Sequence, residues 1–232
     1  MDALLHRRAV PGVNAPPEAF AAARHRHRPA FPKQGALSEG FIVLRNGDAC
    51  AFQPRDEGRR DGASGTHSFS GMIGTAIADR MPQRLAHLVY VDAMVPLPGE
   101  NWSSTHAAAT PEARIKAAEA SHDYSFPPPD PSVYGLIASQ YEWVKRRQVP
   151  HPGHTYTAQL HFDPVRVASV PRTHIACTSP ALATIDVSRK GVRDPAFWGG
   201  PWRIAELLTG HDPMVSEPAA LAGILLGTVQ ST

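Results

Sequence analysis

The sequence has few cysteines, no long apolar run and almost no net charge, and each scarcity excludes a class of protein. Its two cysteines, Cys50 and Cys177, lie far apart and outside any CxxC pattern, which argues against a disulfide scaffold and a zinc knuckle. No apolar run approaches the roughly 20 residues that span a bilayer. Residues 1–13 lack the apolar core of a secretory signal. We therefore expect a soluble, cytoplasmic protein with no membrane partner.

The formal net charge is only +2 among 232 residues, which is too small to indicate nucleic acid or an acidic surface as a partner. The short basic run at residues 24–28 has no aromatic platform beside it and predicts a solvated tail. Four histidines lie fairly close together, but their spacings match no zinc signature. They are His151, His154, His161 and His174. We expect neither a nucleic-acid partner nor a metal site.

Charge and composition divide the chain near residue 66. Residues 1–66 carry ten Lys/Arg and seven Asp/Glu, whereas residues 67–232 carry thirteen and fourteen. The first part is rich in proline and arginine, residues 41–44 are its clear strand candidate, and residues 53–66 predict a loop. We expect an atypical segment of low order over residues 1–65 and a single α/β domain over residues 66–232.

Residues 66–71, Thr-His-Ser-Phe-Ser-Gly, predict a nucleophile elbow at Ser68 that opens onto an amphipathic helix. In a Gly-x-Ser-x-Gly elbow the serine occupies a strained turn, so the residues two before and two after it must be small. Here those places hold Thr66 and Ser70, which breaks the strict pattern twice. The alternative interpretation is a polar turn that caps the next helix.

Three runs after the elbow predict the strands of a parallel sheet. The first lies within residues 85–95 and contains Leu88–Val91, an apolar stretch without alternation, as in a strand buried on both faces. Asp92 stands at its carboxyl end, where open α/β sheets place catalytic groups, although a cap at a strand end is an equal alternative. The other two runs are residues 172–178 and 202–207.

The segment between the first two runs, residues 96–165, is interpreted as an insert that caps the site, with helices over residues 111–121 and 133–147. A last helix is expected over residues 215–229, with Ser216 as its cap.

A serine hydroxyl needs a base to take its proton, and the base is usually a histidine oriented by a carboxylate. His211 lies on a Gly-containing loop between the last strand and the last helix. In α/β-hydrolases the catalytic residues follow the chain order serine, acid, histidine. Ser68 and His211 therefore agree with one architecture although they lie far apart in the sequence.

Several motifs in the right order resemble the α/β-hydrolases related to plant methylesterases and hydroxynitrile lyases, a family with many bacterial esterase-like members. The resemblance covers roughly residues 66–232 and implies a mostly parallel sheet with a helical cap. It implies Ser68 as nucleophile, His211 as general base and the Phe69 backbone N–H as an oxyanion donor. The matching stretches are residues 67–72, 86–93, 95–96, 150–152, 155–156, 171–173, 177–178 and 209–214.

The acid is open between two carboxylates. The plant enzymes place theirs shortly after the strand that corresponds to residues 173–178, but residues 179–182 contain no carboxylate. Asp186 lies a little further on, and Asp92 occupies a position that some hydrolases use. We prefer Asp92 and keep Asp186 as the alternative.

Two departures from the family bear on function. Cyanogenic lyases of this family carry a lysine directly after the histidine, whereas this chain has Asp212, which favours ester hydrolysis. Residues 59–65 resemble no buried strand, and no His-Gly pair precedes Ser68 to supply the second oxyanion donor. We hypothesise that the front strands are missing or replaced, residues 1–65 being a frame-shifted or mis-started segment or a very divergent replacement.

The sequence thus predicts a serine carboxylesterase that cleaves a small, largely apolar ester through an acyl-enzyme and needs no cofactor. Trp143 is the main candidate for the substrate pocket, and ordinary core or cap packing is the alternative. The weaker candidates are Tyr141, Phe197, Trp198 and Trp202. The rival to the enzyme is a catalytically impaired hydrolase-like protein that only binds a small molecule, or a truncated or frame-shifted product.

Overall fold

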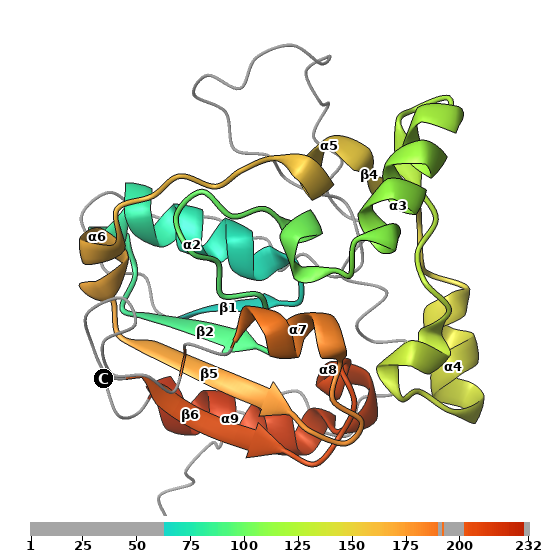
Figure 1. Cartoon of the computed structure of the whole chain (residues 1–232). Coiled ribbons are helices and arrows are strands. Elements are labelled where there is room, and N and C mark those ends of the chain that lie inside the picture. Colours follow the sequence, from blue (N-terminus) through green and yellow to red (C-terminus); the bar gives the residue numbers. More distant parts are fainter. Residues whose placement is uncertain (1–62, 190–191, 193–201, 230–232) are drawn as a thin grey trace, which may run out of the picture. The chain divides into compact units, whose positions relative to one another are not determined.

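The computed structural model of the chain describes residues 63–189, 192 and 202–229. These residues build a four-stranded, fully parallel sheet in the order β1-β2-β5-β6 (Figure 1). The strands are β1 (Ala63–His67), β2 (His87–Val91), β5 (Arg172–Cys177) and β6 (Arg203–Leu207).

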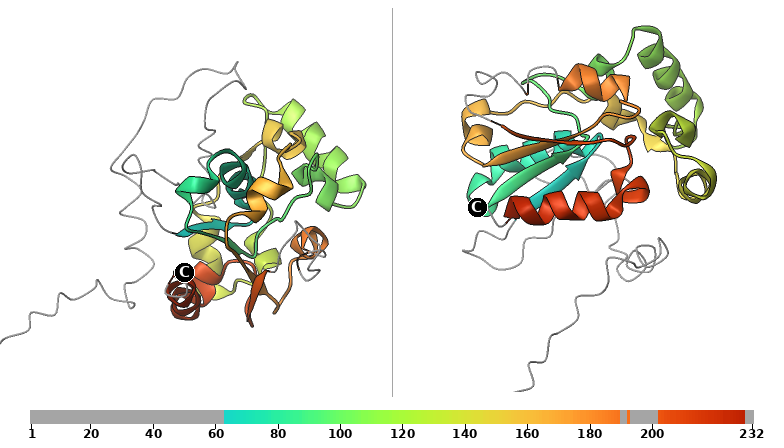
Figure 2. Two further views of the ribbon diagram at one scale, coloured as in Figure 1. Left: turned by 90° about the vertical axis from the view of Figure 1, so that its left-hand side faces the viewer. Right: turned by 90° about the horizontal axis from the view of Figure 1, so that it is seen from below.

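Strand β2 shows how the sheet is covered on both sides. Leu88 and Tyr90 pack in one cluster with residues of α2 (Ser70–Arg80) and α6 (Pro164–Ala168). Val89 and Val91 point to the opposite face and pack with Leu221 of α9 (Pro218–Val229). Because successive side chains of a strand alternate between faces, the sheet lies between two helical layers, as Figure 2 also shows. All five residues of β2 and all six of β5 are buried. The apolar run Leu88–Val91 predicts this burial for β2, whereas β5 is buried although it begins with Arg172, Thr173 and His174.

The long segment between β2 and α6 folds into short helices and a two-stranded antiparallel ribbon, with α3 and α4 beside the sheet in Figure 1. The 3-10 helix η4 (Pro131–Tyr134) and α4 (Ala138–Lys145) are separate, so the single helix expected over residues 133–147 is wrong. Gly135 at φ +76° interrupts it with a left-handed turn. The other elements are η3 (Trp102–Thr105), α3 (Ala109–Ala120), β3 (Ser125–Phe126), β4 (His151–Pro152) and α5 (Gly153–Thr157).

Near the carboxyl end of the chain, α7 (Ala183–Ser188) follows β5 and α8 (Pro213–Ser216) follows β6. The last helix is shorter than the expected span of residues 215–229, because Ser216 ends α8 and α9 starts at Pro218. The 3-10 helix η2 (Pro82–Arg84) joins α2 to β2. Within the residues described, no helix has both the length and the apolar character that a membrane crossing requires.

The expectation that residues 53–66 form a loop is wrong for their last four members, because β1 begins at Ala63. This strand pairs in parallel with β2 along its whole length, from Ala63 opposite His87 to His67 opposite Val91. Its sequence, Ala-Ser-Gly-Thr-His, has little intrinsic strand propensity, and the pairing with β2 overrides that weak local preference. The strand candidate at residues 41–44 lies outside the described residues.

Candidate active site

Ser68 lies in a tight turn between the end of β1 and the start of α2. Its φ is +56°, a left-handed value that is strained for a residue with a side chain. The carbonyl of Ser68 accepts hydrogen bonds from the backbone N–H groups of Gly71 at 3.2 Å and Met94 at 3.0 Å. The turn is therefore held both by its own helix and by the segment that follows β2.

The two departures from the elbow pattern are accommodated by neighbouring residues. Ser70, two residues after Ser68, donates through its hydroxyl to the His67 carbonyl at 2.6 Å and accepts from the His67 N–H at 2.7 Å. Thr66, two residues before Ser68, packs its methyl group against Gly74 of α2, where an added Cβ would lie only 2.4 Å from that methyl. Threonine is therefore tolerated at position 66, where the strict elbow pattern has glycine, because Gly74 of α2 has no side chain that would clash with it.

Ser68, His211 and Asp92 form one chain of hydrogen bonds. Asp92 Oδ2 lies 2.8 Å from His211 Nδ1, and His211 Nε2 lies 2.8 Å from Ser68 Oγ. A carboxylate can only accept, so Nδ1 carries the proton of a neutral His211 and Nε2 accepts from the serine hydroxyl. Ser68 comes from the turn after β1, Asp92 from the end of β2 and His211 from the loop after β6. These three segments meet at the carboxyl edge of the sheet.

Asp92 is fully buried and is held by three further features. Its Oδ1 accepts from the Cys177 N–H at 3.0 Å and from Arg189 Nη1 at 2.7 Å, and its own φ is +39°. Burial alone would raise the pKa of the Asp92 carboxyl. The hydrogen bond from His211, the positive charge of its imidazolium form, the Cys177 N–H and the Arg189 charge outweigh burial and hold this pKa below its ordinary value. Asp92 is therefore an anion next to His211 at neutral pH.

The alternative acid, Asp186, lies on α7 and forms an ion pair with Arg189. Its side chain is 45% exposed, whereas that of Asp92 is 0% exposed. The structure thus places Asp92 against His211. It places Asp186 against Arg189, which also donates to Asp92. Sequence reasoning missed Arg189, because its bond to Asp92 spans 97 positions of the chain and has no local signature.

Phe69, the expected oxyanion residue, immediately precedes the first residue of α2, so its N–H lies at the positive end of an 11-residue helix. Its ring contacts Trp102 of η3 at 5.0 Å and the edge of His151 of β4 at 5.1 Å between centroids. Trp143 instead stacks under Arg147, whose guanidinium lies 4.2 Å from the ring centroid. Trp102, which the sequence did not single out, is therefore the tryptophan beside Phe69.

Other predicted positions are distributed as follows. Trp202 packs on Tyr90, 5.2 Å between ring centroids, on the face of the sheet that α2 and α6 cover. His174 is buried within β5 and His154 stacks on Tyr124, so these two histidines share no site. The weaker pocket candidates at residues 197 and 198 lie outside the described residues.

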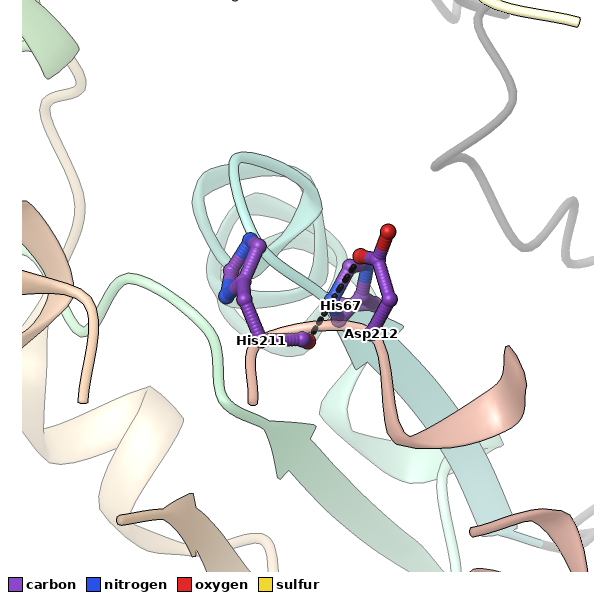
Figure 3. Close-up of side chains that lie close together, drawn as sticks. All are labelled: His67, His211 and Asp212. Carbon is purple, nitrogen blue, oxygen red and sulfur yellow. Dashed lines mark hydrogen bonds and ion pairs between the residues drawn. The ribbon is translucent and has the colours of Figure 1, made fainter. Parts of the chain in front are cut away.

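One group of possible metal ligands occurs in the described part of the chain: His67, His211 and Asp212, whose ligand atoms lie within 4.8 Å of one another. Both ring nitrogens of His211 already bond to Ser68 and Asp92. His67 Nε2 bonds to the His211 carbonyl at 2.7 Å (Figure 3). A metal would have to break these bonds, so the geometry favours a hydrogen-bonded cluster over a metal centre.

The parallel sheet, the strained elbow and the Ser-His-Asp chain of hydrogen bonds define an α/β-hydrolase. Comparison with known proteins agrees. The chain is 30% identical over 165 residues to a carbendazim-hydrolyzing esterase of Nocardioides sp. (strain SG-4G), a match that covers 67% of this chain and 66% of the relative. The chain has the α/β-hydrolase fold, and it spans 66% of the length of this esterase relative.

Solved structures show the same fold. An extracellular α/β-hydrolase from a Paenibacillus species superposes with a TM-score of 0.60 at 19% identity, covering 72% of this chain and 71% of the other. A pyrethroid hydrolase from Sphingobium faniae JZ-2 gives a TM-score of 0.53 at 18% identity, covering 76% and 72%. No protein-family model matches the chain.

Proposed function

We propose that this chain is a serine carboxylesterase that hydrolyses a small, largely apolar ester through an acyl-enzyme. The observation that carries the proposal is the pair of 2.8 Å hydrogen bonds that link Ser68 to His211 and His211 to buried Asp92. The 30% identical esterase supports the same class of reaction.

In the proposed reaction the Ser68 hydroxyl attacks the ester carbonyl while His211 Nε2 takes its proton. The Phe69 N–H stabilises the oxyanion of the tetrahedral intermediate, and one such donor is worth roughly 10²–10³ in turnover. The imidazolium, held by the Asp92 carboxylate, then protonates the leaving alcohol. His211 next deprotonates a water molecule, which attacks the acyl-Ser68 ester. As the bond between the acyl carbon and Ser68 Oγ breaks, His211 returns this proton to Ser68 Oγ and the carboxylic acid is released. No cofactor takes part in these steps.

The apolar character of the substrate is inferred from the side chains around Phe69. Buried Met72, Met94 and Ile185 form one cluster, against which Phe69 and Trp102 pack. The free energy of apolar acyl or alcohol groups falls when such side chains remove them from water, so these groups would bind here favourably. We keep Trp143 as a further candidate for this pocket, to be tested together with Trp102.

The second oxyanion donor is not assigned to a residue of this chain. In the family it comes from a loop that precedes the elbow strand, and the residues before Ala63 lie outside the described part of the chain. The chain spans 66% of the length of its esterase relative. We propose a hydrolase-like domain that includes β1, with residues 96–165 as its cap. Sequencing the gene locus tests the frame-shift hypothesis for the first part of the chain.

Labelling with a fluorophosphonate probe tests the proposal, with Ser68→Ala as the matched control and p-nitrophenyl acetate turnover as a second readout. We expect labelling and turnover in the purified chain and neither in Ser68→Ala. A folded chain that shows no labelling would instead support the rival, a hydrolase-like protein that binds a small molecule without cleaving it. Carbendazim belongs in the substrate screen because the 30% identical relative hydrolyses it.

A further inference from the structure

A second histidine, His67, lies directly behind His211 and is not used by the proposed proton transfer. His67 is the last residue of β1 and is 4% exposed. The two imidazole rings are 4.6 Å apart between centroids and tilted by 38°. Because His67 precedes Ser68, it belongs to the same turn as the proposed nucleophile.

Two oxygen atoms face the Nε2 atom of His67 (Figure 3). The backbone carbonyl of His211 lies at 2.7 Å and Asp212 Oδ1 at 3.6 Å. A carbonyl and a carboxylate can only accept, so Nε2 carries a proton and donates to the His211 carbonyl. The Asp212 carboxylate lies close enough to favour that same tautomer electrostatically.

The backbone of His211 is held through its N–H group as well as through its carbonyl. The His211 N–H donates to the Tyr134 carbonyl of η4 at 3.1 Å, and the Tyr134 ring lies 5.2 Å from the His211 ring between centroids. The backbone of the proposed base is therefore fixed from one side by the segment after β2 and from the other by β1.

We propose that His67, assisted by Asp212, is a positioning residue that sets the distance between Ser68 and His211. The bond from His67 to the His211 carbonyl joins the neighbour of the nucleophile to the backbone of the base, across 144 positions of sequence. This bond couples the turn at Ser68 to the loop that contains His211, so a displacement of one is transmitted to the other. This inference rests on the proposed function, and it adds a residue for which the proton transfer itself has no use.

The test compares His67→Gln with His67→Met. The two new side chains are similar in length and shape, but only glutamine has a terminal N–H that can donate to the His211 carbonyl. We expect His67→Met to lower kcat for p-nitrophenyl acetate roughly 10- to 100-fold, since small misplacements of a reacting group cost rates of this order. KM should stay nearly unchanged, and His67→Gln should recover most of the activity. Equal kcat values in two variants with similar melting temperatures would overturn the inference.

A second readout does not depend on turnover. The Nδ1 proton of His211, hydrogen-bonded to Asp92, gives a far-downfield proton NMR signal that His211→Gln identifies by its loss. We expect His67→Gln to keep this signal and His67→Met to broaden or lose it. If the unmodified chain is not labelled by fluorophosphonate, the proposed esterase function fails, while the NMR comparison still decides the positioning role. Equally sharp signals in both variants would refute that role.

Discussion

Replacing Asp92 by asparagine tests the proposed site most directly, because it changes one atom at the centre of the hydrogen-bond chain. Asp92 accepts from His211 Nδ1 through Oδ2 and from Cys177 and Arg189 through Oδ1. In Asp92→Asn the amide oxygen can keep the second pair of bonds, which leaves the NH₂ group facing His211. Both groups would then be donors, so Nδ1 must lose its proton and His211 adopts the Nε2–H tautomer.

That tautomer donates to Ser68 instead of accepting from it, so the base can no longer take the serine proton. In serine proteases the equivalent change lowers kcat about 10⁴-fold, which corresponds to about 5 kcal/mol in the activation free energy. We expect a loss of this order for Asp92→Asn. The chain should still fold, because asparagine preserves the side-chain volume and Arg189 keeps its ion pair with Asp186.

Asp186→Asn is the matched control. Its carboxylate is 45% exposed and contacts Arg189 rather than His211, so we expect a change of at most about twofold, as for substitutions at exposed positions. The assay is the rate of fluorophosphonate labelling together with kcat for p-nitrophenyl acetate, with melting temperatures recorded for both variants. A large loss in Asp186→Asn with near-normal activity in Asp92→Asn would refute the assignment of the acid.

Three further predictions concern the folding and reactivity of the described residues. Gly71→Ala should lower the free energy of unfolding by about 1–3 kcal/mol, because its Cβ would lie 2.0 Å from the Met94 carbonyl oxygen. Gly65→Ala is its control, with no atom within 4 Å of the added Cβ, and urea unfolding compares the two. Burial and a neighbouring positive charge lower the pKa of His106 from 6.5 to about 4. Between those pH values the unfolded chain therefore binds a proton at His106 that the folded chain does not bind. The free energy of unfolding should decrease as the pH is lowered through that range, and the decrease should be smaller in His106→Gln. Identical slopes in the two proteins would contradict this. Burial raises the pKa of the Cys177 thiol to about 12, so peptide mapping should find it alkylated by iodoacetamide in urea but not in the native protein. Alkylation at equal rates in both states would show that the thiol is accessible.

Local sequence was sufficient to predict three of the strands and to select two residues that the structure brings into contact. Strand β2 contains the apolar run Leu88–Val91 and is fully buried, whereas β6 is a strand although four of its five residues are not buried. Ser68 and His211 lie in short motifs whose order along the chain carries information, because the fold connects its strands in a fixed sequence. Their hydrogen bond to one another is what that order implies.

Local sequence failed where long-range contacts decide the outcome. Strand β1 consists of small and polar residues, and it forms because β2 offers a complete ladder of backbone partners. Trp102 rather than Trp143 lies beside Phe69 because short helices and a two-stranded ribbon determine the path of the insert. Each of these depends on a partner far away in the chain.

The acid illustrates the difference most clearly. The sequence offered Asp92 and Asp186 on nearly equal terms, since both follow a predicted strand and a carboxylate has no local signature for its role. The tertiary structure separates them because the loop after β6 brings His211 over the end of β2, where Asp92 is fully buried, while α7 directs Asp186 to Arg189. Sequence by itself determined which residues can do the chemistry. Only the packing of the loops against the sheet decided which of them meet.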